Sequence, residues 1–243
     1  MSKIKQKKAF EYNYSPNFYA KKRKKKDIKE IVIHYTGMKN ELAAIKKLTN
    51  FKSNVSCNYF IKLNGKIIQM VPDEYASWHA GFSSWKNKKF LNKSSIGIEI
   101  QNPGHRHKYS NFSYKQVEST IKLLKILTKK FKINKKLVLG HSDIAPDRKK
   151  DPGEKFPWKL LSKHKLSIWH NLNKIYLTNM RGIKLDSKNT KKFYNLLKNI
   201  GYRAKKQKKL IQSFQRRFRP ELINGIPDKE CEVIAKNLIK CGI

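Results

Sequence analysis

Two short apolar runs, far apart in the chain, each lead directly to a histidine. Residues 31–33 (Ile-Val-Ile) precede His34, and residues 137–140 (Leu-Val-Leu-Gly) precede His141. Because β-branched apolar runs are typical of buried strands, both histidines are predicted to lie at strand ends. The second run opens onto a loop rich in Pro and Gly that also contains Asp151. The sequence therefore predicts a sheet that carries two imidazoles and a carboxylate near its edge.

Two imidazoles and one carboxylate are a common ligand set for a catalytic zinc whose fourth position stays open. Each residue also has a simpler interpretation, since a single His is more often structural and Asp in such a loop often stabilises a turn. Asp143 lies close to His141 in sequence, so it cannot easily face the same ion if the strand continues into a helical turn. Spacing alone does not exclude Asp147. The residues therefore predict a Zn²⁺ site on His34, His141 and a carboxylate of this loop, with Asp151 as the candidate and Asp147 as the alternative.

Two further residues have side chains suited to catalysis. Glu99 lies in the otherwise apolar run 96–100, where the polar face of an alternating strand would also explain it. Its catalytic interpretation is a general base that accepts a proton from metal-bound water. Lys149 lies two residues before Asp151, and its ammonium could stabilise a developing oxyanion. The abundance of lysine in this chain weakens the second assignment.

A third group of residues suits substrate binding. Trp78 and His79 stand beside Gly81 in the stretch Ser-Trp-His-Ala-Gly, which fits a loop that binds sugar or peptide, although Trp78 could also cap the core. His105 and His107 are predicted to lie in an exposed loop. Together with Asn102 they could line a cleft.

The charge of the chain is strongly basic. It has 56 Lys and Arg against 17 Asp and Glu, a formal net charge of +39, and only eight of the basic residues are Arg. Nucleic-acid-binding surfaces usually concentrate Arg and aromatic residues, whereas Lys is scattered here. Lysine on solvated faces explains this pattern, and binding of a polyanion is the alternative. We expect no specific nucleic-acid partner, but a field that favours anionic ligands.

Cysteine usage and hydropathy bear on the compartment. The three cysteines, Cys57, Cys231 and Cys241, are odd in number and lack metal-ligand spacing, which is typical of free thiols in a reducing environment. The sequence has neither the apolar core of a signal peptide nor a run of about 20 apolar residues that could span a membrane. We therefore expect a cytoplasmic protein with no membrane segment.

The pattern of apolar residues predicts an α/β domain followed by helices. Asn64-Gly65 between two apolar runs predicts a hairpin. Strands are predicted at residues 31–33, 58–63, 66–71, 95–100 and 136–139, and helices at 40–50 and 113–131. These alternating elements predict a central mixed β-sheet flanked by helices.

The chain is predicted to divide into four parts. A basic extended lead-in covers residues 1–28, the catalytic domain 29–161, and a linker with a short helix 162–185. Residues 186–243 form a small all-α domain, with helices predicted at 186–200, 206–218 and 228–241. Gly201 and Pro220 end the first two helices, and Pro227 precedes the third.

In combination, these motifs resemble the zinc N-acetylmuramoyl-L-alanine amidases of the AmpD/AmiD type, which are related to phage lysozyme-amidases and peptidoglycan recognition proteins. The matching stretches cover roughly residues 12–160: His-Tyr-Thr at 34–36, Val-Ser-Cys-Asn-Tyr at 55–59, Ala-Ser-Trp-His-Ala-Gly at 76–81, Ile-Gly-Ile-Glu-Ile-Gln-Asn-Pro-Gly at 96–104, Gly-His-Ser-Asp-Ile-Ala-Pro at 140–146 and Asp-Pro-Gly at 151–153.

The resemblance implies zinc on His34, His141 and Asp151, with Glu99 as the general base and Lys149 as the oxyanion stabiliser. It implies hydrolysis of the amide between the lactyl group of N-acetylmuramic acid and L-alanine. Three positions depart from the family pattern: Asn58 stands where histidine is common, Asp147 where glycine is usual, and Cys57 where some relatives have a catalytic tyrosine. The missing tyrosine fits the branch that uses a glutamate.

The tail resembles the three-helix peptidoglycan-binding domain of the AmiD subgroup, on the stretches 196–202, 214–220 and 225–228. We therefore expect a monomeric amidase that acts on peptidoglycan or muropeptides. The alternatives are a peptidoglycan-binding protein without catalysis and a basic protein associated with nucleic acid.

Overall fold

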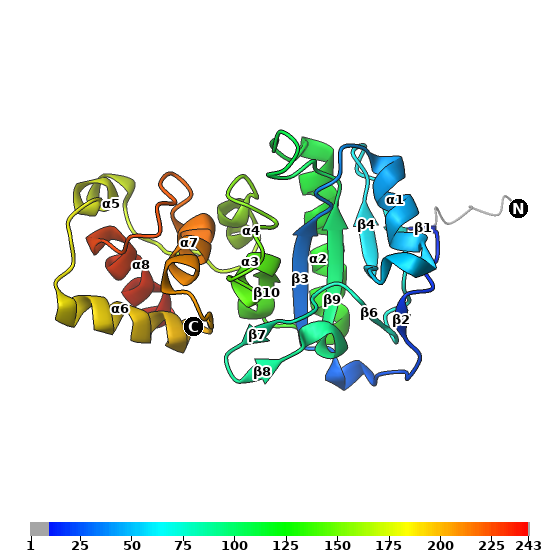
Figure 1. Ribbon diagram of the computed structural model, residues 1–243, viewed down its shortest axis with the longest axis horizontal. Helices are drawn as coiled ribbons and strands as arrows, with labels where there is room; N and C mark the ends of the chain where they lie inside the picture. The colour runs from blue at the N-terminus through cyan, green and yellow to red at the C-terminus, as the bar shows by residue number, and fades with distance from the viewer. Residues whose placement is uncertain (1–9, 243) are drawn as a thin grey trace, which may run out of the picture.

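The computed structural model describes residues 10–242, and a six-stranded mixed sheet forms the centre of its larger region, with the C-terminal helices beside it (Figure 1). Its order is β1 (Glu11–Tyr12), β5 (Ile67–Gln69), β4 (Tyr59–Ile61), β9 (Ser95–Ile100), β3 (Glu30–Tyr35) and β10 (Val138–Gly140). All neighbouring strands are parallel except β4 and β5, which form the hairpin that Asn64-Gly65 predicts. The predicted mixed sheet flanked by helices is confirmed.

One face of the sheet packs on the long helix α2 (Tyr114–Phe131). Ile31 and Ile33 of β3 point to this face, and they share a buried cluster with Leu124 and Leu127 of the helix. A capping box starts α2, because the Ser113 side chain accepts from the Gln116 N–H and the Gln116 side chain accepts from the Ser113 N–H. Alternation along β3 therefore sends Val32 and His34 to the opposite face.

The opposite face of the sheet is covered at its two ends. At one end, α1 (Glu41–Thr49) packs Leu48 near Phe60 of β4 in a small buried cluster. At the other end, Val32 and Leu139 pack in a cluster with the C-terminal helices. A cavity opens between these two covers, near the carboxyl ends of β3 and β9.

Shorter elements complete the catalytic region. Strand β2 (Phe18–Tyr19) pairs with β6 (Ala76–Ser77), and β7 (Ser84–Trp85) pairs with β8 (Lys88–Lys89). The remaining elements are η1 (Lys25–Asp27), η2 (Phe51–Ser53), η3 (Leu91–Ser94), η4 (Lys135–Leu137), α3 (His141–Ile144) and α4 (Trp158–Lys163).

The predicted lead-in packs against this region where the structure describes it. Its first nine residues lie outside the described part of the chain. Further along, β1 pairs with β5, and the Arg23 guanidinium donates to the carbonyls of Asp73 (2.9 Å) and Ser95 (2.7 Å). Residues 10–28 are therefore part of the catalytic region's packing.

The C-terminal region is helical, with α5 (Lys174–Met180), α6 (Ser187–Ile200), α7 (Gln207–Phe218) and α8 (Lys229–Lys240). The three predicted helices are confirmed as α6, α7 and α8, while α5 lies within the predicted linker. Asp186 and Asp228 cap α6 and α8 by accepting backbone N–H donors.

The catalytic and helical regions share a buried core. Trp85 of β7 packs edge-to-face on Tyr202, with ring centroids 5.1 Å apart. A Cβ on Gly201 would lie 2.4 Å from Trp85, so only glycine fits at this contact. The Arg217 guanidinium of α7 donates to the buried Asp143 carboxylate of α3. The helical region is therefore packed on the catalytic region through both apolar and charged contacts.

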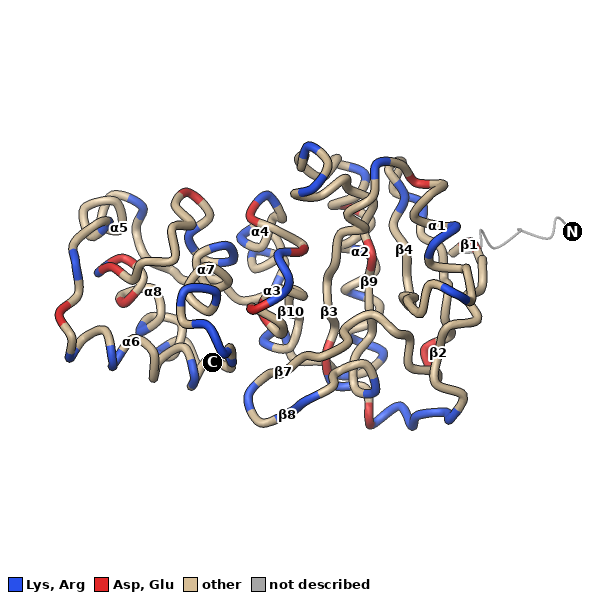
Figure 2. Tube along the Cα trace, in the orientation of Figure 1, with Lys and Arg blue, Asp and Glu red and all other residues tan. Residues whose placement is uncertain are grey.

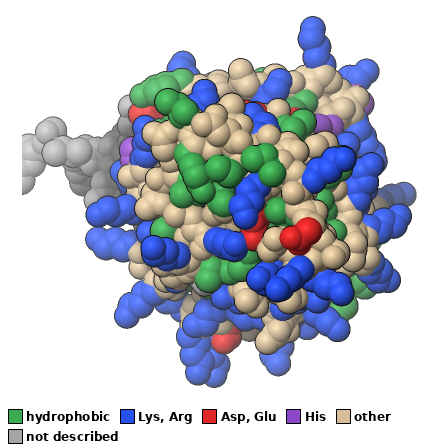
Figure 3. Space-filling view, turned by 90° about the vertical axis from the view of Figure 1, so that its left-hand side faces the viewer, with side chains coloured by type: hydrophobic (Ala, Val, Ile, Leu, Met, Phe, Trp, Pro, Cys, Tyr) green, Lys and Arg blue, Asp and Glu red, His purple; other side chains and the backbone are tan. Residues whose placement is uncertain are grey.

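Basic residues are spread over nearly every element and not gathered on one (Figure 2). On the face formed by the helical region, Lys and Arg side chains surround an apolar area (Figure 3). Among residues 10–242, no helix has the length and apolar character needed to cross a bilayer.

Candidate active site

The site lies where three parallel strands end. His34 is the fifth residue of β3, His141 follows directly after β10, and Asp151 lies in the loop that leaves α3. Parallel strands bring their carboxyl ends to the same sheet edge, which is where α/β sheets place their ligands. The Ser142 N–H donates to the Asp151 carbonyl at 2.7 Å, and this bond folds the loop back over β10.

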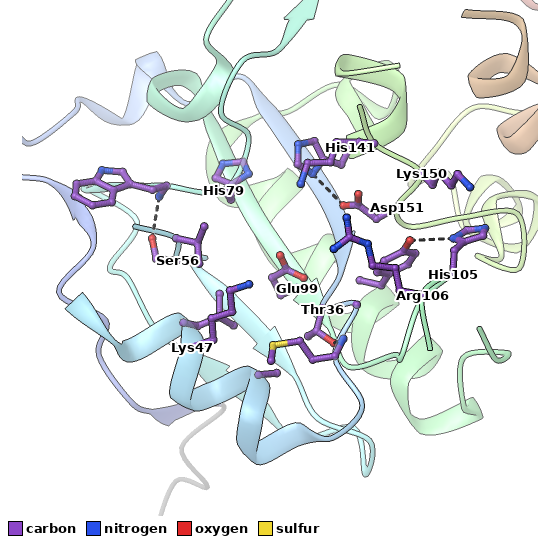
Figure 4. A pocket seen from close by; sticks show the side chains of 18 of the residues that line it. Thr36, Lys47, Ser56, His79, Glu99, His105, Arg106, His141, Lys150 and Asp151 are labelled. Carbon is purple, nitrogen blue, oxygen red and sulfur yellow. Dashed lines mark hydrogen bonds and ion pairs between the residues drawn. The ribbon is translucent and has the colours of Figure 1, made fainter. Parts of the chain in front are cut away.

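Three acceptor atoms converge at this edge. The Nδ1 atoms of His34 and His141 are 2.8 Å apart, and each lies 3.0 Å from Oδ2 of Asp151. Figure 4 shows the contact between His141 and Asp151. All three residues are buried, and no other group of three or more His, Cys, Asp or Glu donors this close occurs within residues 10–242. Tetrahedral zinc with bonds of about 2.0–2.1 Å holds its ligand atoms about 3.3 Å apart, so a small expansion would accommodate the ion.

The hydrogen bonds of the two rings fix which nitrogen faces the centre. Nε2–H of His141 donates to the Ala80 carbonyl at 3.1 Å. Nε2–H of His34 donates to Nδ1 of His79 at 2.9 Å, and Nε2–H of His79 donates to the Ser95 hydroxyl at 3.1 Å. Each neutral ring then presents a lone pair at Nδ1, beside an anionic carboxylate. Such a cluster has no donor of its own and is suited to a cation.

The protonation of these groups agrees with metal binding. Burial, and then the neighbouring His141, lower the pKa of His34 to about 4, so its ring is neutral at pH 7. Burial alone would raise the pKa of Asp151, but its contacts with His141 and His34 hold it well below its usual value. Neutral imidazole and ionised carboxylate are the forms that bind a metal ion.

Glu99 stands directly beside the ligand triad. In the sheet register His34 pairs with Glu99 across β3 and β9, so their side chains lie on the same face. Burial, and then the charge of Asp151, raise the pKa of Glu99 well above its usual value. Its buried Oε2 has no hydrogen-bond partner within residues 10–242. A carboxyl group with a raised pKa and a free oxygen is suited to proton transfer.

Glu99, His141 and Asp151 line a cavity of about 550 Å³. Trp78 and Lys149 also line it, as do the cationic side chains of Lys47, Arg106 and Lys150. No hydrogen bond or ion pair within the described chain holds any of these four cationic heads. The cavity therefore offers free positive charge around a buried cluster of acceptors.

The other predicted site residues are placed differently. Both ring nitrogens of His79 are engaged, with His34 and with Ser95, so this ring supports a ligand of the centre. Asn102 is buried, donates to the Ser110 carbonyl (2.9 Å) and accepts from the Gly104 N–H (3.0 Å). Its side chain orders the loop after β9 and does not line the cavity.

The two competing carboxylates have other partners. Asp143 accepts from the Gly140 N–H at 2.7 Å and from the Tyr202 hydroxyl at 2.8 Å. Asp147 is exposed and accepts from the backbone N–H groups of Lys205 and Lys206. Neither carboxylate belongs to the convergent triad, which leaves Asp151 as the third acceptor.

Sequence reasoning missed several residues of the cavity. Lys47 and Arg106 line it, yet nothing in their local pattern distinguishes them from other basic residues. Arg148 also lines it, and its guanidinium donates to the carbonyls of Ala80 and Phe82. Arg148 lies between the motifs at 140–146 and 151–153, and the chain has few Arg residues, so its position could have marked it as a residue of the site. His105, by contrast, was expected as a residue that could line a cleft; it does line this cavity, and its Nδ1 accepts from the Tyr35 hydroxyl at 2.9 Å.

Comparison with known sequences gives one consistent family. A family model described as N-acetylmuramoyl-L-alanine amidase matches residues 24–154. AmiD of Escherichia coli (strain K12) is 33% identical over 231 residues, which span 88% of this chain and 83% of AmiD. AmpD of the same strain, a 1,6-anhydro-N-acetylmuramyl-L-alanine amidase, is 36% identical over 104 residues, 43% of this chain and 55% of AmpD.

Solved structures extend the likeness to both regions. The complex of E. coli AmiD with the substrate anhydro-N-acetylmuramic acid-L-Ala-D-γ-Glu-L-Lys matches with a TM-score of 0.79 at 33% identity, over 89% of this chain and 90% of that one. AmpDh3 from Pseudomonas aeruginosa matches with a TM-score of 0.76 at 26% identity, over 100% and 99% of the two chains. The likeness thus covers both the sheet region and the helical tail, and this chain belongs to the N-acetylmuramoyl-L-alanine amidase family.

Proposed function

We propose that this protein is a zinc amidase that hydrolyses the bond between N-acetylmuramic acid and L-alanine in peptidoglycan or its soluble fragments. The observation that carries the proposal is the convergence of His34, His141 and Asp151 on one point. The Nε2–H group of each histidine already donates to another residue, so both Nδ1 atoms are available to the metal. Zinc bound there would polarise the lactyl carbonyl and supply an activated water.

Glu99 has the role of general base in this proposal. It lies beside His34 in the sheet register, and its free oxygen is available to a water molecule in the cavity. The raised pKa of Glu99 lets its carboxyl group both accept a proton from water and return it to the leaving amine of alanine.

Lys149 has the role of oxyanion stabiliser. It lines the same cavity, and its charge acts on both His34 and Glu99. An ammonium at this place would favour the tetrahedral intermediate, in which negative charge develops on the former carbonyl oxygen.

The remainder of the cavity suits the substrate. Stem peptides of peptidoglycan carry carboxylates, and Lys47, Arg106 and Lys150 provide positive charge along the cavity wall. Trp78 offers an apolar surface in the same cavity, and we propose that it contacts the substrate. The buried positions of His79 and Asn102 favour supporting roles for these two residues.

The test is a defined muropeptide assay with metal analysis. Purified protein should contain about one zinc per chain, lose activity to a chelator and recover it when zinc is returned. The Asp151→Ala variant should lose both zinc and turnover, whereas the Asp147→Ala control should keep both. Binding of muropeptide without zinc-dependent release of the stem peptide would favour the peptidoglycan-binding alternative.

We further propose a monomer that works in the cytoplasm. Its three cysteines are free thiols, two of them buried, as is common in reducing compartments. Cell fractionation with a tagged full-length chain tests the compartment, and sedimentation tests the oligomeric state.

A further inference from the structure

A second cavity lies next to the catalytic one, on the seam between the two regions. It has a volume of about 530 Å³ and is lined by residues 82–84 and 89–90 around the β7–β8 hairpin, by residues 144–148 after the metal-ligand histidine, and by residues 203–205 before α7. Figure 1 shows the β7–β8 hairpin reaching from the sheet toward the helical region. We call this cavity the hairpin groove.

Two exposed aromatic rings form one side of the hairpin groove. The Phe82 side chain is 79% exposed and the Phe90 side chain 58% exposed, with ring centroids 5.5 Å apart. Large apolar side chains gathered on a surface commonly mark a binding site. These two rings therefore form an apolar platform that the fold itself leaves unfilled.

The backbone holds this platform in a strained conformation. Phe90 has φ 55° and ψ 61°, in the left-handed region that bulky residues rarely adopt. The Phe90 N–H donates to the Ser83 carbonyl at 2.9 Å, and the Leu91 N–H donates to the Ser83 hydroxyl at 3.0 Å. Strain of this kind persists only where neighbouring contacts enforce it and is concentrated at functional sites. The Phe90 ring is thus fixed in its exposed position.

The hairpin groove adjoins the catalytic cavity, and the two share one lining side chain. Arg148 lines both cavities. Its guanidinium donates to the Phe82 carbonyl, at 2.9 Å from Nε, and to the Ala80 carbonyl, which also accepts from His141. A ligand whose reacting bond lies at the triad can therefore extend past Arg148 onto Phe82 and Phe90.

We propose that the hairpin groove is an accessory subsite for the glycan strand, binding the sugar rings that adjoin the muramic acid whose amide is cleaved. This inference rests on the proposed amidase function. Pyranose rings present C–H groups on one face and hydroxyls at the edge, so they stack on aromatic rings and bond to nearby hydroxyls. Phe82 and Phe90 supply the rings, and Ser84 supplies a hydroxyl.

The two parts of the substrate suit different features of the two cavities. The stem peptide carries carboxylates, and the cationic groups of Lys47, Arg106 and Lys150 line the catalytic cavity. The hairpin groove also has basic side chains, so its charge does not select the neutral glycan, but its two exposed aromatic rings favour stacking on sugar rings. The stem peptide is therefore assigned to the catalytic cavity and the glycan to the aromatic platform on the other side of Arg148.

The test compares two substrates with the same stem tripeptide, one on a single muramic acid and one on a four-sugar glycan. Phe82→Ala and Phe90→Ala should lower kcat/KM about three- to tenfold on the four-sugar substrate, and change it less than about twofold on the single sugar. Tyr114→Ala, at an 80% exposed aromatic position on α2, is the matched control and should affect neither substrate.

A binding experiment tests this inference separately from the amidase proposal. Chitotetraose, a neutral four-sugar probe, should bind the zinc-loaded protein in a calorimetric titration and bind the Phe82→Ala variant several-fold more weakly. Failure of wild type to cleave either substrate would overturn the amidase function itself. Normal cleavage with equal losses on both substrates, or with no losses, would overturn the subsite alone. Self-association that Phe82→Ala abolishes would also overturn it, because the groove would then hold a second copy of the chain.

Discussion

Arginine and lysine have different roles in this chain. Arg217 donates to the buried Asp143, and Arg219 is fully buried and donates to Asp228 at 2.8 Å and to Glu230 at 3.3 Å. The lysines among residues 10–242 are instead all exposed or half-buried. The planar guanidinium makes several directed bonds at once, whereas ammonium groups are strongly hydrated. The few Arg residues are therefore better guides to structure than the many Lys residues.

At the residue scale, Glu99→Gln should separate catalysis from metal binding. The amide keeps the size of the side chain but cannot accept a proton, so kcat should fall by about 10²–10⁴-fold while zinc content stays unchanged. Steady-state assays with metal analysis measure both quantities. Glu118→Gln, at an exposed position on α2, is the control. Turnover near the wild-type rate would remove Glu99 from its proposed role.

Also at this scale, Gly97→Ala should disturb the metal site although Gly97 is not a neighbour of any proposed ligand in sequence and the substitution changes no ligand side chain. A Cβ at Gly97 would lie 2.4 Å from Cγ of His79, and the central strand β9 cannot move away, so the His79 ring must shift and lose its bond to His34. We expect a loss of about 1–3 kcal/mol in the free energy of unfolding and zinc affinity weakened by about 10–100-fold.

A double-mutant cycle with His79→Ala tests this mechanism. If Gly97→Ala acts through the His79 ring, it should cost much less stability once that ring has been removed. Additive losses, measured by urea unfolding, would show that the glycine matters for another reason.

At the element scale, the short helix α3 (His141–Ile144) links the metal site to the helical region. Its first residue is a proposed ligand, and its third, Asp143, accepts from the Tyr202 hydroxyl and the Arg217 guanidinium. Ser213 of α7 donates to the Ser142 carbonyl at 2.6 Å. The position of α3 therefore depends on contacts that come from the other region.

Tyr202→Phe should loosen this link. The change removes one hydrogen bond from a buried carboxylate, which should lower the free energy of unfolding by about 1–3 kcal/mol. Zinc affinity, measured by competition with a chelating dye, should weaken because α3 carries His141. Tyr194→Phe is the control, since that hydroxyl makes no hydrogen bond within residues 10–242. Equal effects of the two substitutions would contradict the link.

At the scale of the whole molecule, the two regions form one structural unit. A single buried cluster joins Val32 and Leu139 of the sheet to Phe193 and Phe214 of the helices. The sequence predicted a linker over residues 162–185, yet Leu177 within it is buried in the same cluster. The helical region is thus expected to stabilise the catalytic region, in addition to any ligand binding of its own.

The stability of the metal-free protein should fall as the solution is acidified. Burial lowers the pKa of His170 from 6.5 to about 4, with a smaller contribution from Lys159, and His34 and His79 are shifted in the same direction. Between these pH values the unfolded chain binds protons that the folded chain does not, so the free energy of unfolding rises with pH. The shift of His170 contributes no more than about 3 kcal/mol. Glu99, whose pKa is raised, acts in the opposite direction.

Urea unfolding at pH 7 and pH 5 measures this effect. His170 lies outside the metal site, so His170→Gln should reduce the difference between the two pH values. His164→Gln, at an exposed position, controls for the loss of an imidazole. An unchanged difference in His170→Gln would rule out a contribution from this ring.

Local sequence pattern was enough to predict much of the fold and part of the site. The β-branched runs before His34 and His141, the Asn64-Gly65 turn and the capped helix after Ser113 all act over a few residues, so they can be read without a structure. Because parallel strands end at a common edge, these runs also predicted that the two histidines would lie together.

Only the tertiary structure decided which partners each side chain has. Asp143, Asp147 and Asp151 are alike in sequence, and long-range contacts alone direct the first to Tyr202, the second to the backbone before α7 and the third to the histidines. The same holds for His79, whose support of His34 depends on a glycine in a different strand. Such contacts join residues far apart in the chain, and local propensity contains no information about them.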